Sequence, residues 1–296
     1  MSFSSKVKSE LCKIDAPYCC KYAECYGSLL CFKALKTTPF TIQSENEEVI
    51  EHIKLSCKKF FGTSFTLSSF GNKKDIFSLS CKNEDAEIIK KALLTSEKTV
   101  IQSNIIADEC CKISFIRGAF LACGYIDEPE KNYNLEFVFS DLTLAYEFEQ
   151  VLEEFNLAPK WSQRHNYAVL YFKESEKIED ILTLMGASNK TLELAEIKVI
   201  KDIRNNLNRT TNFMSANIGK AVNAAVDQRN SINALKEAGL FNSLSNELKE
   251  AANLRLQYPE SSLQEILEES KVSLSKSGLN HRLQKLISIA QSKGLI

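Results

Sequence analysis

The sequence has little of what marks a secreted, membrane-embedded or metal-built protein. It contains one tryptophan and five prolines among 296 residues. Its first ten residues lack the apolar core of a signal peptide, and no hydrophobic run is long enough to span a bilayer. All ten cysteines fall at or before Cys123, where no Cys-x-x-Cys pair or neighbouring histidine gives them metal-ligand spacing. We therefore expect a cytoplasmic protein without a metal or cofactor.

The ten cysteines are expected to be reduced thiols. In a reducing compartment most of them would be buried and would serve as small hydrophobic side chains. The alternative is a redox or zinc site built from Cys19, Cys20, Cys110 and Cys111. We disfavour it because adjacent cysteines are poorly placed to chelate one metal ion.

Charge is balanced overall but unevenly distributed along the chain. Lys and Arg number 37 against 38 Asp and Glu, a net charge of −1, which argues against a basic coat over the whole protein. Residues 101–195 carry 8 basic and 16 acidic side chains, whereas residues 196–296 carry 14 basic and 10 acidic ones. The middle of the chain is thus acidic and its end is basic.

The chain contains one long internal repeat. Cys19-Cys20-Lys21 leads to Gly27, and Cys110-Cys111-Lys112 leads with the same spacing to Gly118. Small and apolar residues follow both glycines, as two helices packed tightly against each other would require. A repeat of this length predicts two structurally equivalent halves, about 1–100 and 101–196, rather than a solenoid of short units.

Apolar periodicity predicts mixed helices and strands in both halves. Each half reads as helix, two strands, helix, two strands, helix, which gives eight short strands in curved sheets with the repeated helices between them. Asp141 is expected to cap a helix, and Gly71-Asn72 to form a turn. The expected helices cover 19–33, 47–61, 84–94, 113–123, 141–155 and 178–185. Seven of the eight expected strands have assigned bounds: 32–36, 39–44, 64–69, 76–81, 134–139, 160–164 and 167–172.

The last third of the chain is expected to be helical after a polar linker over 197–217. Asparagines and basic residues here serve either as phosphate contacts or as linker positions only. The last two helices of this region have the layout of a helix-turn-helix, and Ser262 and Glu265 match a capping box. The expected helices cover 218–238, 245–257, 262–269 and 275–291, and the polar candidates are Arg204, Asn205, Asn208, Arg209 and Lys220.

The final helix carries the main candidates for DNA contact. Its apolar stripe must face a core. From Lys271 to the end there are five basic residues and no acidic one, so the opposite face can approach a polyanion without repulsion. A merely solvated surface helix is the alternative. The stripe is Leu279, Leu283, Leu286, Ile287 and Ala290; the expected groove contacts are Lys276, Ser277, Asn280, His281 and Gln284, with Arg282 and Lys285 near phosphates.

These features together resemble a known family. The two repeated helices resemble the LAGLIDADG motif of homing endonucleases. That pair, followed by the C-terminal sequences below, resembles the WhiA family of bacterial sporulation and cell-division regulators over essentially the whole chain. The matching sequences are Arg204-Asn205, Asn208-Arg209, Ala216-Asn217, Lys220, Asn223-Ala224-Ala225-Val226 and the stretch from Leu274 to Leu283.

The resemblance implies a fold class and a function. The fold would be an α+β, pseudo-two-fold LAGLIDADG homing-endonuclease-like domain over 1–196, the linker over 197–217, and a separate all-α helix-turn-helix domain over 218–296. The function would be that of a nucleoid-associated transcriptional regulator that binds promoter sites in double-stranded DNA. Such a regulator would support cell division, chromosome segregation and, where present, sporulation, with other transcription or division proteins as further partners.

The motif positions that hold metal in a homing endonuclease are degenerate in this sequence. Such an enzyme needs a carboxylate at the penultimate position of each motif helix, because metal-assisted hydrolysis requires anionic oxygen ligands. Aligning the two motif glycines puts Phe32 and Cys123 there. Asp127 lies one turn beyond Cys123 if that helix continues, without a partner carboxylate in the first half. We expect no enzyme activity; an active LAGLIDADG-type endonuclease and a nucleoid or division scaffold are the alternatives.

The acidic second half also bears on whether the sheets grip DNA. Gripping a duplex requires several Lys or Arg side chains to displace counterions. We therefore expect the sheets to form a partner or scaffold surface, with Lys36, Lys160 and Arg164 as the positions available for local DNA contact.

Overall fold

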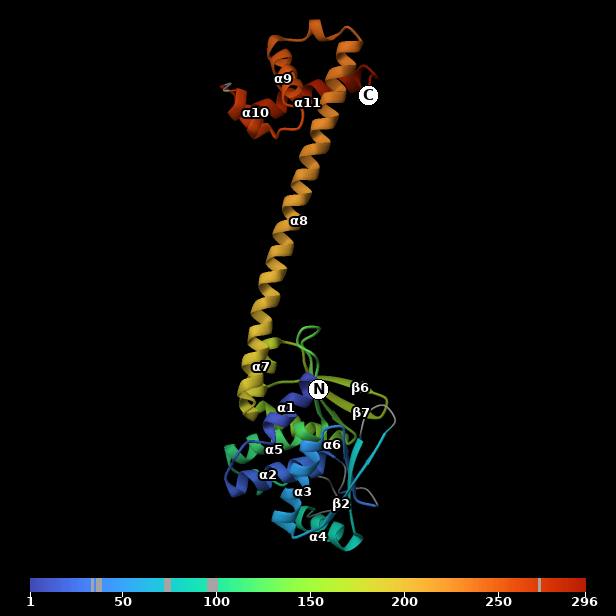
Figure 1. The fold of residues 1–296 in the computed structure, drawn as a ribbon, viewed down its shortest axis with the longest axis vertical. Helices are drawn as coiled ribbons and strands as arrows, with labels where there is room; N and C mark the ends of the chain where they lie inside the picture. Colours follow the sequence, from blue (N-terminus) through green and yellow to red (C-terminus); the bar gives the residue numbers. More distant parts are fainter. Residues whose placement is uncertain (33–34, 36–38, 72–75, 95–100, 271–272) are drawn as a thin grey trace. The chain divides into compact units, whose positions relative to one another are not determined.

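The computed structural model describes residues 1–32, 35, 39–71, 76–94, 101–270 and 273–296. They form two compact units, residues 1–202 and 203–296 (Figure 1). The first unit mixes helices with antiparallel sheets, and the second is built from helices. The α+β class expected for the N-terminal part and the all-helical class expected for the C-terminal part are both confirmed.

Two antiparallel sheets form the framework of the first unit. In the smaller sheet, Leu67 lies opposite Leu79, and in the larger one Trp161 lies opposite Leu170. The smaller sheet has the order β1-β3-β2, from β1 (Thr41–Ser44), β2 (Phe65–Phe70) and β3 (Ile76–Cys81). The larger has the order β4-β5-β7-β6, from β4 (Gly124–Ile126), β5 (Leu135–Phe139), β6 (Lys160–Arg164) and β7 (Tyr167–Phe172).

The helices of this unit begin and end where local chemistry dictates. The side chains of Asn46 and Asp141 each accept two backbone N–H groups at the start of a helix, which confirms the expected Asp141 cap. Gly62 and Gly186 end helices with φ of 67° and 92°, a left-handed conformation that costs glycine little. The helices are α1 (Phe3–Leu11), α2 (Tyr18–Cys31), α3 (Glu47–Phe61), α4 (Asn83–Leu93), α5 (Glu109–Cys123), α6 (Leu142–Glu153) and α7 (Ser175–Met185).

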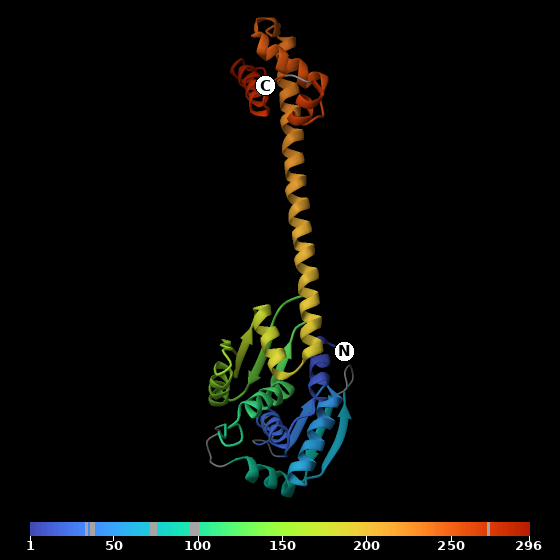
Figure 2. The same cartoon turned by 90° about the vertical axis from the view of Figure 1, so that its left-hand side faces the viewer.

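The repeated helices α2 and α5 pack along each other between the two halves. In Figure 2 the strands of the first half (blue to cyan) and of the second half (green to yellow-green) lie on opposite sides of this pair. A Cβ at Gly27 would lie 2.5 Å from the backbone oxygen of Phe115, and a Cβ at Gly118 would overlap the backbone oxygen of Glu24. Glu24 and Phe115 occupy equivalent positions in the repeat, as Gly27 and Gly118 do. The two glycine contacts are therefore related by the pseudo-two-fold symmetry of the halves. The predicted seam of two equivalent halves is confirmed.

The second unit has its own core. Buried residues from three of its helices and from the end of α8 make up this core, and Gly239, at φ 70°, follows α8. The expected capping box is present, because Ser262 N donates to Glu265 Oε2 (2.6 Å) and Glu265 N donates to Ser262 Oγ (3.3 Å). No helix in the described ranges is long and apolar enough to cross a membrane. The elements are α8 (Ser188–Glu237), the 3₁₀ turn η2 (Phe241–Ser243), α9 (Asn246–Gln257), α10 (Leu263–Ser270) and α11 (Lys276–Ser292).

The segment 197–217 is helical rather than an irregular linker, and the helix expected to begin at Ile218 begins at Ser188. The reason is that 188–237 contains no proline and only one glycine, Gly219, so nothing interrupts the backbone hydrogen bonds. The hydroxyl of Thr210 even donates back to the carbonyl of Asn206 (2.9 Å). Asparagine content alone was therefore a poor guide to the conformation of this segment.

The strand pattern of the two halves is also less regular than expected. The strand ending at Ser44 pairs with β3. Most of its predicted hairpin partner, 32–36, lies outside the described residues, as does Asn72 of the expected turn. A short strand, β4, follows α5 directly, and the helix α1 was not predicted. The described part of the chain contains seven strands instead of eight.

Candidate nucleic-acid interface

The apolar stripe of α11 fixes the rotation of this helix in its unit. Leu279, Leu283 and Leu286 have no exposed surface and pack in one cluster with Ile266 of α10 and Ala252 of α9. Because full burial of a leucine side chain contributes about 1.5–3 kcal/mol, turning the helix would be costly. The stripe also includes the buried Ala290 and the half-buried Ile287, as expected.

The start of α11 is capped by a side chain and presents free amides. Ser275 Oγ accepts from the backbone N–H of Gly278 at 3.1 Å and lies 3.1 Å from the hydroxyl of Ser277. The remaining N–H groups of the first turn have no partner within the helix, and the positive end of the helix dipole lies there. This end of the helix can accept a phosphate.

The polar face of α11 is open to solvent. At about 100° per residue, the predicted contact residues from Lys276 to Lys285 lie within roughly half of the helix circumference, opposite the buried stripe. Within the described ranges, no ion pair involves Lys276 or Lys285, so both cations are free to meet phosphates. The exposed residues of this face are Lys276, Ser277, Asn280, His281, Gln284 and Lys285.

Arg282 differs from the other candidates. It is half-buried on the side of α11 that faces α9, and its guanidinium donates to Glu250 Oε2 at 3.0 Å. A second carboxylate, that of Glu247, lies 3.9 Å away. The structure thus separates Arg282 from the open face and places it in a contact that holds α11 against α9.

The polar candidates of α8 are exposed and lie on one side of that helix. Arg204, Asn205, Asn208 and Arg209 fall within about 140° of the circumference, with Lys220 on the same side further along. The other side of the helix exposes apolar residues at helical spacing. This spacing is visible in the sequence, but the prediction of a polar linker did not take it into account. These residues are Val199, Ile203, Leu207, Met214 and Ile218.

In the first unit, the degenerate motif positions lie at the C-terminal ends of α2 and α5. Phe32 follows the last residue of α2, and Cys123 is the last residue of α5. The hydrogen bond that the Cys31 thiol makes with Cys123, together with burial, raises the pKa of Cys31 well above its usual range. Thiols and a phenyl ring lie at the positions that the motif alignment predicts for the metal-binding carboxylates of a homing endonuclease.

The condition under which Asp127 would lie one helical turn beyond Cys123, a continuation of α5, is not met. The chain leaves the helical conformation at Gly124, whose φ and ψ are −81° and 147°. Asp127 instead follows β4, where its backbone N–H donates to the carbonyl of Asn134 at 3.0 Å. The early glycine and the start of a strand redirect the chain before α5 can carry a carboxylate to this position.

Sequence reasoning missed Lys8, which lies at the C-terminal end of α5. Its amine donates to the carbonyl of Leu121 at 3.0 Å, and burial lowers its pKa to about 8 although the nearby thiols Cys123 and Cys12 act to raise it. At pH 7 most Lys8 side chains still carry a positive charge. A half-buried cation at this end of the motif helices disfavours a divalent metal. The apolar residues Phe3, Val7 and Leu11 on α1 were the available signal.

The cations named for the larger sheet are paired with carboxylates. Lys160 Nζ lies 2.5 Å from Glu174 Oε1, and Arg164 Nη2 lies 3.0 Å from Glu136 Oε2. Lys36 lies outside the described residues. This sheet therefore offers DNA less free positive charge than its lysines and arginines suggest.

Comparison with known proteins places this arrangement in a family. Residues 112–204 match the model of the WhiA LAGLIDADG-like domain, and residues 207–290 match that of the WhiA C-terminal HTH domain. A probable cell division protein WhiA from Clostridium tetani is 34% identical, and the match covers 98% of both chains. The chain belongs to the WhiA family. Its WhiA relative from Clostridium beijerinckii is 36% identical, again over 98% of both chains.

The fold agrees with that of a solved WhiA structure. Full-length WhiA from Thermatoga maritima superposes with a TM-score of 0.58 and 22% identity, covering 99% of each chain. At this level of identity the likeness concerns the fold alone. This member of the WhiA family thus has two units. The first is LAGLIDADG-like and has degenerate motif positions, and the second is a helix-turn-helix unit.

Proposed function

We propose that this chain is a sequence-specific regulator of transcription that reads promoter sites in double-stranded DNA through α11. The observation that carries the proposal is the open face of α11, which presents six exposed polar or basic side chains while its apolar side is fixed in a core. No acidic residue occurs from Lys271 to the end of the chain. The family supports a role in cell division, since its curated relatives are named for that process; chromosome segregation and, where present, sporulation belong to the same proposal.

The residues of α11 divide into base-reading and phosphate-binding groups. Asn280 and Gln284 are one turn apart, so their amides are about 6 Å apart along the helix axis and would address base pairs about two steps apart. Amides of this kind pair with adenine through two hydrogen bonds. Ser277 and His281 lie between them, and Lys276 and Lys285 would bind phosphates.

The same proposal assigns secondary contacts elsewhere on the chain. Arg282 would act mainly by holding α11 against α9 through Glu250, with the phosphate contact expected from the sequence as a minor role. Further phosphate contacts would come from the polar side of α8. That side comprises Arg204, Asn205, Asn208, Arg209 and Lys220.

For the LAGLIDADG-like unit we propose a scaffold or partner surface without nuclease activity. Phe32 and Cys123 provide no carboxylate, and Lys8 supplies a half-buried cation at the end of α5. The net acidic charge of residues 101–195 and the pairing of Lys160 and Arg164 with glutamates favour protein partners over DNA. An active endonuclease would require metal ligands from other residues.

Substitution of Asn280 tests the base-reading role. Sites are first selected from random duplexes with the full-length protein, and affinities for a selected site and a random duplex are then measured by fluorescence anisotropy. We expect Asn280→Ala to weaken binding to the selected site by about 1–3 kcal/mol, about 5- to 150-fold, and to leave random DNA nearly unchanged. Asn253→Ala, at an exposed position of α9, is the matched control. Equal losses on both DNAs would make Asn280 a phosphate or structural residue and would contradict the proposal.

A further inference from the structure

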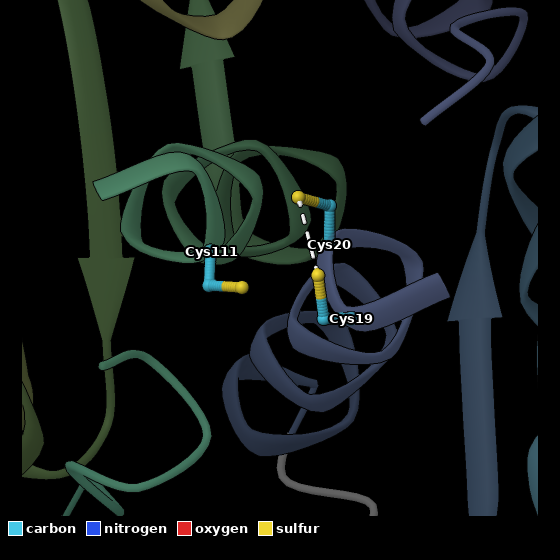
Figure 3. Close-up of side chains that lie close together, drawn as sticks. All are labelled: Cys19, Cys20 and Cys111. Carbon is cyan, nitrogen blue, oxygen red and sulfur yellow. Dashed lines mark hydrogen bonds between the residues drawn. The ribbon is translucent and has the colours of Figure 1, made fainter. Parts of the chain in front are cut away.

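Three cysteine sulfurs meet at the N-terminal ends of the motif helices. The Sγ atoms of Cys19, Cys20 and Cys111 all lie within 4.8 Å of one another, and those of Cys19 and Cys20 are 4.0 Å apart. Figure 3 shows the two thiols of α2 turned toward each other beside Cys111 of α5. Adjacent cysteines were expected to be poorly placed to chelate one metal ion, yet the sulfurs of this pair lie on the same side as that of Cys111.

The cluster follows the internal repeat. The repeat relates Cys19 to Cys110 and Cys20 to Cys111. Cys20 and Cys111, the two buried members of the group, therefore occupy equivalent positions in the two halves. Both halves supply thiols to one point, and Cys110 adjoins Cys111 in the chain.

The surroundings suit a bound ion. Cys20 and Cys111 are buried, whereas Cys19 and Cys110 are exposed, so an ion can enter from solvent and still be largely enclosed. The neighbours Ala16, Ala23 and Ile105 form a small apolar cluster with Cys20 and Cys111. All four cysteines lie in the first turns of α2 and α5.

We propose that Cys19, Cys20 and Cys111 bind a thiophilic metal ion of the Zn²⁺ class, with Cys110 as the fourth ligand. In a tetrahedral thiolate site with Zn–S bonds of about 2.3 Å, the sulfurs are roughly 3.8 Å apart. The sulfurs of Cys19, Cys20 and Cys111 lie within 4.8 Å of one another, so these three need to close by about 1 Å at most, which side-chain rotation can provide. Such an ion would join α2 to α5 and link the stability of the first unit to metal supply.

The experiment uses full-length protein that has been reduced and stripped of metal. Zn²⁺ alone is titrated against a competing chelator, and Co²⁺ alone is added in parallel for its absorption spectrum. We expect one equivalent of Zn²⁺ to bind with a Kd below about 1 µM, and Co²⁺ to give the thiolate charge-transfer and tetrahedral ligand-field bands. Mass spectrometry after alkylation should show that Zn²⁺ protects these four cysteines selectively, a readout that needs no substitution.

Two variants complete the test. Cys19→Ser/Cys111→Ser should abolish the Co²⁺ bands, whereas Cys81→Ser, at a half-buried cysteine outside the cluster, should retain them. Fluorescence of Trp161 checks that each variant is folded. The proposal fails if the wild-type protein binds less than half an equivalent of Zn²⁺ or gives no thiolate bands with Co²⁺. It also fails if Zn²⁺ protects none of the four thiols, or if they form a disulfide on exposure to air in the presence of Zn²⁺.

Discussion

The close approach of α2 and α5 makes a quantitative prediction for Gly27→Ala. The added Cβ would lie 2.5 Å from the backbone oxygen of Phe115, whereas even a close carbon–oxygen contact is about 3.3 Å long. A backbone atom cannot rotate away, so the two helices would have to separate by about 0.8 Å. Overpacking of this kind costs about 1–3 kcal/mol, and we expect the upper part of that range because the whole seam shares the displacement.

An opposing effect reduces this cost. Alanine is favoured over glycine in a helix by about 1 kcal/mol, so the net loss in the free energy of unfolding should be about 2 kcal/mol. Gly118→Ala should act in the same direction, since its Cβ would overlap the backbone oxygen of Glu24. At Gly219 of α8 the added methyl group would meet nothing within 4 Å, so Gly219→Ala should stabilise that helix.

The assay is urea unfolding followed by tryptophan fluorescence. Trp161 is the sole tryptophan of the chain, and its indole N–H donates to Glu149 Oε1 at 2.6 Å within the first unit. With a slope of about 2 kcal/mol per molar urea, a loss of about 2 kcal/mol moves the midpoint down by about 1 M. Gly219→Ala should leave this midpoint unchanged. A Gly27→Ala protein as stable as the wild type would refute the inference that the seam is held by direct backbone contact.

Three further predictions concern a buried ion pair, the DNA interface and catalysis. In the ion pair, Arg117 Nε of α5 donates to Glu24 Oε2 of α2, both side chains are buried, and His52 lies on the other carboxylate oxygen. Burial acts to raise the pKa of Glu24, but the hydrogen bond from His52 and the charge of Arg117 outweigh it, so the pKa in the folded protein lies below the ordinary value of 4.5. The ion pair should therefore contribute its full share to the free energy of unfolding above pH 4.5. That contribution should be lost as the pH falls through the lower pKa of the folded state. Glu24→Gln should cost about 3–5 kcal/mol at pH 7 in the Trp161 assay, because Arg117 would be left buried without its partner, and the difference from wild type should shrink in acid; equal stabilities at pH 7 would contradict this. Lys285→Ala should weaken binding to selected and random duplexes alike and reduce the slope of log K against log salt by about 1, whereas an unchanged slope would remove Lys285 from the phosphate contacts. Pure protein with Mg²⁺ should leave supercoiled DNA intact, and nicking that Asp127→Ala abolishes would show that the nuclease is active.

Local patterns predicted much of the fold. The helix over 47–61 has the bounds expected from its apolar spacing, and the Asp141 cap and the box of Ser262 and Glu265 form as their spacing requires. These features depend on residues within one or two turns of each other. The helix at 188–237 was misjudged because its composition suggested a linker, while the apolar spacing from Val199 to Ile218 indicated a helix.

The candidate DNA interface was predicted in its residues but not in all of their surroundings. The exposed face of α11 could be predicted from the helical spacing of Leu279, Leu283 and Leu286. Once these leucines are placed in the core, the residues on the opposite face must be exposed to solvent. The contact of Arg282 with Glu250 does not follow, since it depends on how α9 crosses α11. A residue list alone could not distinguish an arginine free for DNA from one held by a neighbouring helix.

The sequence by itself determined that the chain has two related halves and that a basic helical region follows them. Its motif alignment also predicts that Phe32 and Cys123 replace the metal-binding acids. Repeat spacing, charge and motif alignment need no knowledge of the fold. Only the tertiary structure decided that Lys8 lies at the end of α5 and that Cys19 and Cys20 meet Cys111. The physical reason is that α5 is far from α1 and α2 in the chain, and only the packing of these helices brings Lys8 within hydrogen-bonding distance of Leu121 and the three sulfurs within 4.8 Å of one another.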